Sequence, residues 1–280
     1  MTKRIIGLVL VALALFNVFL GMKAEGNAPV NKEIIESAVL ITDGRILPEN
    51  EGKVVIVQGV LEAPLPYVDE ETGIALHSIV NHRQVEKLEF VYDSEEKKNY
   101  WSWTFTALPD HYGGSNKIIV PDVRMGEYSV AKELLMSLTA NEYRVDYDKK
   151  ELNRQGWNTF EDDGRVYLYK GYHMPEDDEK ALENDRNLEG TLRVAYAEIP
   201  GGETLEYTII GVQMNGLLLE VEKLDMNSVH AGYLTVEELL SYADSSAASA
   251  KKTSMIIAAV LAGIGILLIV KKEGKRGGKK

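Results

Sequence analysis

The sequence contains no cysteine among its 280 residues. A domain built from it has no disulfide framework, and it can enter an oxidising compartment without forming incorrect disulfides. Its stability therefore has to come from a hydrophobic core, which a segment of about 230 residues is long enough to bury.

Histidine is scarce, and the spacing of the five histidines argues against a metal site. No two of them are three or four residues apart, so no pair would share one face of a helix, and no HExxH motif occurs. The acidic runs 161–164 and 176–179 lack the alternating ligand spacing of a calcium loop, which favours solvated turns. We therefore expect no metal and no cofactor.

A catalytic motif is also missing, and no serine stands in a Gly-x-Ser-x-Gly setting. Asp110 and His111 begin the most site-like loop, because a histidine beside an aspartate can act as a base and the glycines that follow allow close approach to the backbone. Ser115 is the nearby candidate nucleophile. A tight turn explains the same residues, so we expect no catalytic residues and keep a membrane-tethered hydrolase as an alternative.

Long hydrophobic runs occur at the two ends of the chain, at residues 5–22 and 255–270. A hydrocarbon core of about 30 Å needs roughly 20 apolar residues in a helix, and flanking lysines can reach the headgroups. The sequence therefore predicts an N-terminal anchor at 1–22, a domain at 23–250, a second membrane helix at 251–270 and a tail at 271–280.

Charge is distributed unevenly along the chain. Residues 24–250 contain 20 basic and 42 acidic residues, a formal charge of −22, whereas basic residues flank the hydrophobic runs. Positive segments are retained in the cytoplasm, so we expect both termini there and the acidic domain outside it. Such a domain repels nucleic acid, while the tail suits anionic lipid in the bilayer. The tail cations are Lys271, Lys272, Lys275, Arg276, Lys279 and Lys280.

The first hydrophobic run also resembles a secretory signal peptide, cleaved after Ala24 or Ala28. Cleavage after Ala24 would put Met22 where a small residue is favoured, and cleavage after Ala28 would be followed by Pro29. The run is also longer than the usual signal core, so we expect an uncleaved anchor.

The central domain is predicted to be α+β and mainly β, with antiparallel meanders and a few short helices. Residues 53–61 predict a strand buried on both faces, and 83–92, 100–106 and 166–169 predict further strands. From residue 191 the pattern predicts a three-stranded meander, with a hairpin turn at Asn215-Gly216. Residues 128–138 and the capping box Thr235/Glu238 predict helices, and 241–250 a juxtamembrane linker.

Aromatic residues alternate at 100–106, which places Trp101 and Trp103 on one face of a strand. Such a row can stack ring-bearing ligands, and it also suits the core face of a sheet. Trp101, Trp103, Asp110 and His111 are therefore the ligand-binding candidates.

Small residues recur four apart in the second membrane helix, as Ala258 with Ala262 and Ala259 with Gly263. This spacing lets helix backbones approach closely. We expect this face to pack on the first anchor or on another copy of the chain.

The order of several sequence blocks resembles the transmembrane protein 43 family, also called LUMA. The blocks are 51–59 (EGKVVIVQG), 83–87 (RQVEK) leading to 100–103 (YWSW), 110–116 (DHYGGSN), 126–129 (GEYS) and 187–242. The resemblance implies an integral membrane protein with a large extracytoplasmic or luminal domain. Animal members organise assemblies in the endoplasmic reticulum and inner nuclear membrane and carry several closing spans, whereas this chain has one. A compact, bacterial-like member would sit in the plasma membrane.

Taken together, these features predict a non-enzymatic membrane scaffold that self-associates or gathers membrane-protein partners. The alternatives are an extracytoplasmic ligand-binding or sensing module and the tethered hydrolase.

Overall fold

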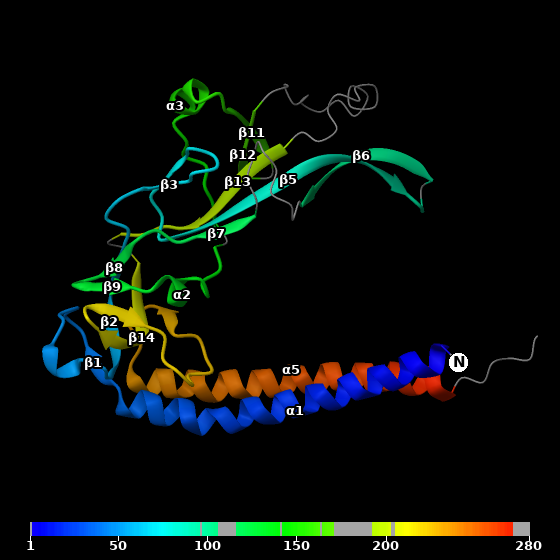
Figure 1. The fold of residues 1–280 in the computed structure, drawn as a ribbon, viewed down its shortest axis with the longest axis horizontal. Helices are drawn as coiled ribbons and strands as arrows, with labels where there is room; N and C mark the ends of the chain where they lie inside the picture. The colour runs from blue at the N-terminus through cyan, green and yellow to red at the C-terminus, as the bar shows by residue number, and fades with distance from the viewer. Residues whose placement is uncertain are drawn as a thin grey trace, which may run out of the picture.

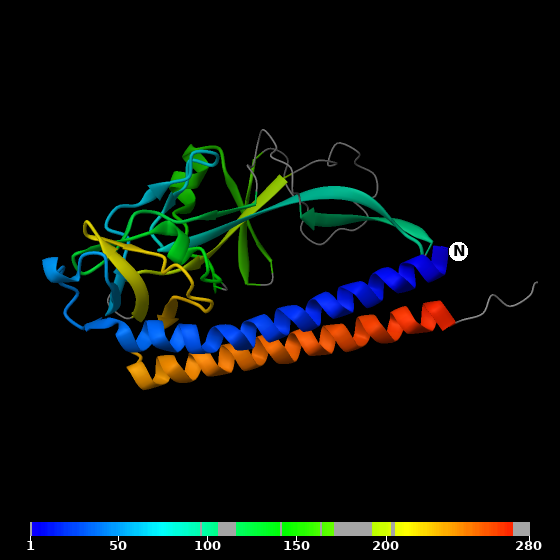
Figure 2. The ribbon, with the colours of Figure 1, turned by 60° about the horizontal axis from the view of Figure 1, so that its bottom comes forward.

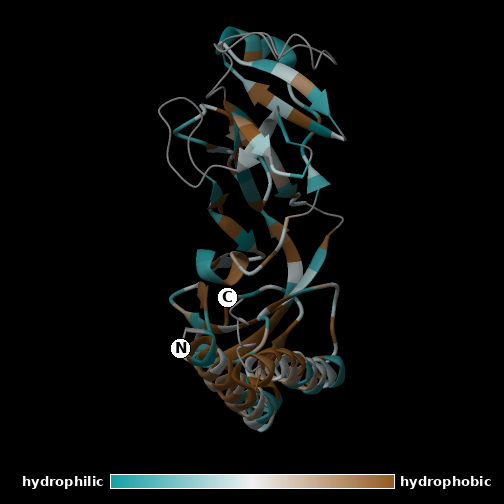
Figure 3. Ribbon diagram, turned by 90° about the vertical axis from the view of Figure 1, so that its right-hand side faces the viewer, coloured by the Kyte–Doolittle hydropathy of each residue, from teal (hydrophilic) through white to brown (hydrophobic). Residues whose placement is uncertain are grey.

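The computed structural model describes residues 2–95, 97–105, 116–140, 142–162, 164–170, 192–202 and 205–270. Two long helices, α1 (Thr2–Ser37) and α5 (Val236–Val270), form an antiparallel hairpin, and the β-structure is stacked to one side of it (Figures 1 and 3). Both helices are long and apolar enough to cross a membrane. These two helices, with a β-rich region between them, confirm the predicted fold class.

The helices extend beyond the predicted hydrophobic runs. At 1.5 Å per residue each is about 50 Å long, which exceeds a hydrocarbon core of about 30 Å. The segment 241–250, predicted as a linker, is instead an uninterrupted part of α5. The small side chains of Ala243 and Ala247 are buried there, which lets this polar-looking segment pack as helix.

The first sheet lies next to the helix hairpin and closes on itself. Its order is β1-β2-β8-β9-β15-β14-β16, and an additional pairing of β2 with β14 joins five of the strands in a ring. The members are β1 (Val39–Ile41), β2 (Val54–Glu62), β8 (Val123–Met125), β9 (Tyr128–Val130), β14 (Glu206–Met214), β15 (Leu217–Leu219) and β16 (Val229–Ala231).

Strand β2 is buried on both faces, as predicted. Val55 and Val57 belong to the core cluster of the ring, while Ile56 belongs to a separate cluster that includes residues of α1 and α5. The helix predicted at 128–138 is largely wrong: residues 128–130 form β9, and the helix α2 covers Lys132–Leu135 alone. Residues 128–130 pair with β8 and with β15, and the buried hydroxyl of Tyr128 donates to the side-chain carbonyl of Gln213 at 2.7 Å.

The second sheet lies farther from the helices and has the order β11-β12-β13-β5-β6, with β10 beside β13 and β7 beside β5. All its pairings are antiparallel. The strands are β5 (Val80–Asp93), β6 (Lys98–Phe105), β7 (Lys117–Ile119), β10 (Glu142–Tyr143), β11 (Asn158–Asp162), β12 (Arg165–Tyr169) and β13 (Leu192–Ile199). Smaller elements are η1 (Pro48–Asn50), β3 (Tyr67–Val68), β4 (Ala75–Leu76) and α3 (Lys149–Arg154).

The three strands predicted from residue 191 exist, but they do not form one meander. The hairpin β14–β15 turns at Asn215-Gly216, both at positive φ, as predicted. Strand β13 instead joins the second sheet. The chain crosses between the sheets at Gly201, where a Cβ would lie 2.8 Å from the Ile79 side chain, so the packing leaves no room for a larger residue at the crossing.

Candidate functional site: the helix hairpin and its attachment to the β-domain

Helices α1 and α5 pack closely through small residues. A Cβ added to Gly7 would lie 2.7 Å from the carbonyl oxygen of Gly265, and one added to Gly21 would lie 3.1 Å from the Cβ of Ser254. This antiparallel register places Ala14 opposite Ala258, and both are buried. Gly7, Ala14 and Gly21 are spaced by seven residues, a period that keeps one seam of a helix against its partner.

The four small residues predicted to pack in α5 separate into two groups. Ala258 is buried and Ala262 is half-buried, whereas Ala259 and Gly263 are exposed. A Cβ on Gly263 would meet nothing within 4 Å. The first row therefore lies on the packed side of α5, and the second row lies on its free side.

The glycine and alanine seam of α1 was not identified from the sequence. The seven-residue spacing of small residues in the N-terminal run was the feature that could have revealed it.

Ion pairs join the two helices beyond the hydrophobic runs. Lys251 donates to both carboxylate oxygens of Glu25 at 2.8 Å, and Lys32 pairs with Asp244 at 2.6 Å. These four side chains are partly exposed, so each pair stabilises the hairpin by about 1 kcal/mol or less. Their positions mark where the helices leave the apolar stretch.

The ends of the helices are fixed to the ring-shaped sheet. Ile35, Leu239 and Ala243 form a buried cluster with Ile56 and Ile210 of the sheet. The helices are therefore packed into the β-domain rather than tethered to it.

A side-chain clamp adds to this attachment. The buried Asn31 accepts a hydrogen bond from the backbone N–H of Asp225 at 2.9 Å and donates to the Asp225 carbonyl at 3.3 Å. Both bonds tie the C-terminal part of α1 to the loop that follows β15.

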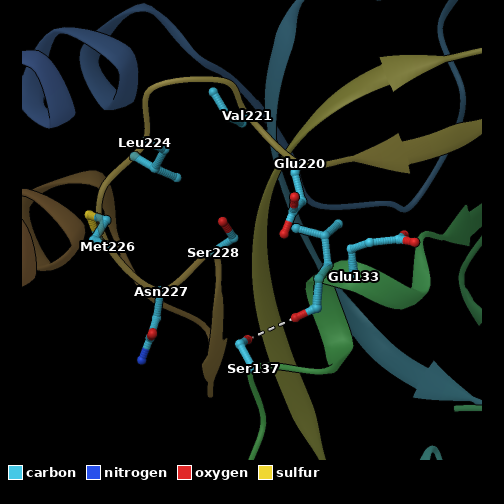
Figure 4. Close-up of a pocket in the computed structure, with 9 residues that line it drawn as sticks. Glu133, Ser137, Glu220, Val221, Leu224, Met226, Asn227 and Ser228 are labelled. Atoms are coloured by element: carbon cyan, nitrogen blue, oxygen red, sulfur yellow. Dashed lines mark hydrogen bonds between the residues drawn. The ribbon is translucent and has the colours of Figure 1, made fainter. Parts of the chain in front are cut away.

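A shallow pocket of about 170 Å³ lies between α2 and this loop (Figure 4). Glu133, Ser137 and Glu220 line one side, and Leu224, Met226, Asn227 and Ser228 belong to the other. The Ser137 hydroxyl donates to the Leu134 carbonyl at 2.8 Å, so it is engaged locally. Among the described residues no group of three or more histidine, cysteine, aspartate or glutamate side chains could hold a metal ion, here or elsewhere.

A buried ionic cluster holds the segment between β3 and β4 against the second sheet. Arg83, which is fully buried, donates to both oxygens of Asp69 at 2.7 and 2.8 Å and pairs with Glu71 at 2.8 Å. The Tyr196 hydroxyl also donates to Asp69, at 2.7 Å.

These contacts set the pKa of Asp69. Burial alone raises it, but the hydrogen bond from Tyr196 and the charge of Arg83 outweigh burial, so the net pKa lies below the ordinary value. Burial raises the pKa of Tyr196, and the Asp69 charge adds to this effect, so the hydroxyl stays protonated. The cluster is suited to holding structure rather than exchanging protons.

Trp103 lies in a second cluster of side chains, on the face of the second sheet opposite to Arg83. The Arg193 guanidinium carbon is 4.3 Å from the Trp103 ring centre and 3.7 Å from the Tyr167 ring centre, and Arg193 pairs with Glu86 at 2.6 Å. The sequence suggested that a ring-bearing ligand could stack on Trp103. Arg193 occupies one face of that ring. Trp101 lies opposite Phe90 in the register of β5 and β6.

Several candidate residues lie outside the described part of the chain. These are the loop residues Asp110, His111 and Ser115 and the six cations of the tail, Lys271, Lys272, Lys275, Arg276, Lys279 and Lys280.

Two comparisons with known proteins bear on the chain. A family model described as transmembrane protein 43 matches residues 84–272, which include most of the second sheet, part of the ring and all of α5. A search of curated proteins gives no match.

Proposed function

The chain belongs to the transmembrane protein 43 family and is a membrane protein, and we propose that it is a non-enzymatic scaffold presenting its acidic β-domain on the extracytoplasmic side. The attachment of α1 and α5 to the ring-shaped sheet carries this proposal. A domain packed onto its own membrane helices has a fixed orientation toward the bilayer, which suits the assembly of partners on one surface. The excess of acidic residues in this domain suits basic partner surfaces.

The proposed orientation places both termini in the cytoplasm, because basic residues lie outside both hydrophobic runs. The absence of cysteine makes a direct test available, since each introduced cysteine is the single thiol of the chain. Val68 is exposed on the β-domain, and Leu20 is exposed within the first hydrophobic run.

In intact cells that produce the chain, Val68→Cys should react with a membrane-impermeant maleimide, and Leu20→Cys should not. A cysteine inserted after Met1 should react only after the cells are permeabilised. Reaction of the N-terminal cysteine in intact cells, with protection of Val68→Cys, would reverse the orientation.

The scaffold role requires association in the membrane. Crosslinking of the full chain in native membranes should capture a second copy or another membrane protein. The control is an unrelated two-span protein expressed at the same level, which should be recovered without a crosslinked partner. Partners are identified by mass and sequence. Recovery of monomer alone, both after crosslinking and in mild detergent, would contradict the scaffold role and leave the membrane placement intact.

A further inference from the structure

A groove lies between α1 and α5, just beyond the hydrophobic runs. It has a volume of about 470 Å³, and all of its lining residues belong to the two helices. Helix α1 contributes Glu25 and Ala28, and α5 contributes one side of the helix between Asp244 and Met255. Figures 1 and 2 both show α1 and α5 side by side, so the groove is a feature of the hairpin itself.

The groove lies at the edge of the hydrocarbon core. The two hydrophobic runs end at the same level, because a Cβ on Gly21 would lie 3.1 Å from the Cβ of Ser254. Glu25 and Lys252 are each three residues beyond the end of their run, which is about 4.5 Å along a helix. The polar layer on each side of the hydrocarbon is about 5–8 Å thick. These two charged side chains therefore belong to helix positions at the depth of the lipid headgroups.

The groove opens on the side of α5 that faces away from the β-domain. Tyr242 and Ser246 face the loop after β15, where they line a separate pocket with Asp225. With about 3.6 residues per turn, Ala248 and Met255, which line the groove, lie on the other side of the helix. Lipid in the surrounding leaflet therefore has access to the groove.

Lys252 supplies a positive charge that no described residue neutralises. Lys251 is paired with both carboxylate oxygens of Glu25 at 2.8 Å, and Asp244 is paired with Lys32 at 2.6 Å. Lys252 is exposed and has no hydrogen bond or ion pair to any residue that the structure describes. The groove thus combines one free cation with two carboxylates that already have partners.

We propose that the groove binds a zwitterionic phospholipid, with the phosphate on Lys252 and an acyl chain against Met255. Met255 is 48% exposed and begins the hydrophobic run three residues after Lys252, so one lipid can contact both side chains. The carboxylates of Glu25 and Asp244 attract the ammonium group of such a headgroup and repel the extra negative charge of an anionic one. This inference rests on the membrane placement of the helices and not on the scaffold role or the orientation.

The test measures the lipid that the full chain retains in native mass spectrometry. The detergent micelles contain equal amounts of phosphatidylethanolamine and phosphatidylglycerol with the same acyl chains. Lys252→Gln removes the free charge of the groove. Lys23→Gln is the matched control, because Lys23 is an exposed cation at the same edge of the hydrocarbon that does not line the groove. Each replacement removes one exposed charge and no core packing.

We expect the unaltered chain and Lys23→Gln to retain phosphatidylethanolamine equally, and Lys252→Gln to retain about threefold less. The unaltered chain should retain less phosphatidylglycerol than phosphatidylethanolamine. Equal retention of phosphatidylethanolamine by the two variants would overturn the proposal, as would stronger retention of phosphatidylglycerol by the unaltered chain. Displacement of the lipid by added inorganic phosphate would assign the groove to free phosphate instead.

Discussion

Gly7 and Gly265 face each other across the helix hairpin so closely that neither could carry a side chain. A Cβ on Gly7 would lie 2.7 Å from the carbonyl oxygen of Gly265, and a Cβ on Gly265 would lie 2.8 Å from that of Gly7. Only backbone movement could relieve either contact, because the opposing atom belongs to the main chain.

Gly265→Leu should therefore separate the two helices at this level and lower the free energy of unfolding by about 1–3 kcal/mol. Gly263→Leu is the matched control on the same helix, because a Cβ there would meet nothing within 4 Å. Gly263→Leu should change the free energy of unfolding by no more than about 0.5 kcal/mol. Denaturant titration of the chain in detergent micelles measures both, and equal destabilisation would show that the packed face of α5 is assigned incorrectly.

The ionic cluster at Asp69 predicts sensitivity to acid. A carboxylate whose pKa is lower in the folded state adds stability that is fully present above its unfolded pKa of about 4 and is lost as pH falls through the folded value. Unfolding followed by tryptophan fluorescence should therefore show a falling free energy of unfolding below about pH 4. Asp69→Asn should reduce this dependence and cost about 3 kcal/mol at neutral pH, since it removes a carboxylate from the buried Arg83. An unchanged acid dependence in Asp69→Asn would exclude Asp69 as its source.

The position of Arg193 between Trp103 and Tyr167 predicts that its planar shape matters as well as its charge. Arg193→Lys keeps the charge but loses stacking on two rings, and we expect a cost of about 2 kcal/mol. Arg165→Lys is the control, because Arg165 is less buried and stacks on Tyr143. The midpoint of chemical unfolding should move clearly for the first variant and by less than half as much for the second. Similar shifts would mean that stacking on two rings adds nothing.

Loss of the Asn31 side chain should loosen the loop after β15. Asn31→Ala leaves the backbone N–H of Asp225 without this acceptor, at a cost of about 1–3 kcal/mol. Hydrogen–deuterium exchange should accelerate at residues 220–228. Asn17→Ala removes only a hydrogen bond to Leu13 within the same helix and should leave that loop unchanged. Acceleration in both variants would point to a general loss of stability instead.

Local patterns in the sequence were sufficient to predict several of the longer strands. The alternation at 100–106 and the β-branched run at 53–61 each correspond to a strand, because burial of one or both faces leaves a direct periodic trace. The hairpin at Asn215-Gly216 was predictable because both residues tolerate positive φ.

The features that were not predicted depend on contacts between distant parts of the chain. The polar segment 241–250 is helical because α1 packs beside it, and Lys251 finds its partner Glu25 at a separation of 226 residues. Likewise, Arg83 and Asp69 are two ordinary charged residues in a sequence rich in them, and only the fold shows that they are buried together. The sheet that β13 joins is likewise set by its pairing with the distant strand β5, from Leu192 opposite Lys87 to Ile199 opposite Val80.

Helices α1 and α5 run from the hydrophobic runs to the buried cluster at Ile35 and Leu239. The two helices therefore transmit motion of the membrane spans to the β-domain. Both helices are continuous, α1 with Pro29 inside it, so a change in the tilt of the spans displaces the β-domain. A tilt of about 10° over about 50 Å of helix moves the far end by about 9 Å. A change in bilayer thickness that alters this tilt would therefore change the height and angle at which the acidic domain is held.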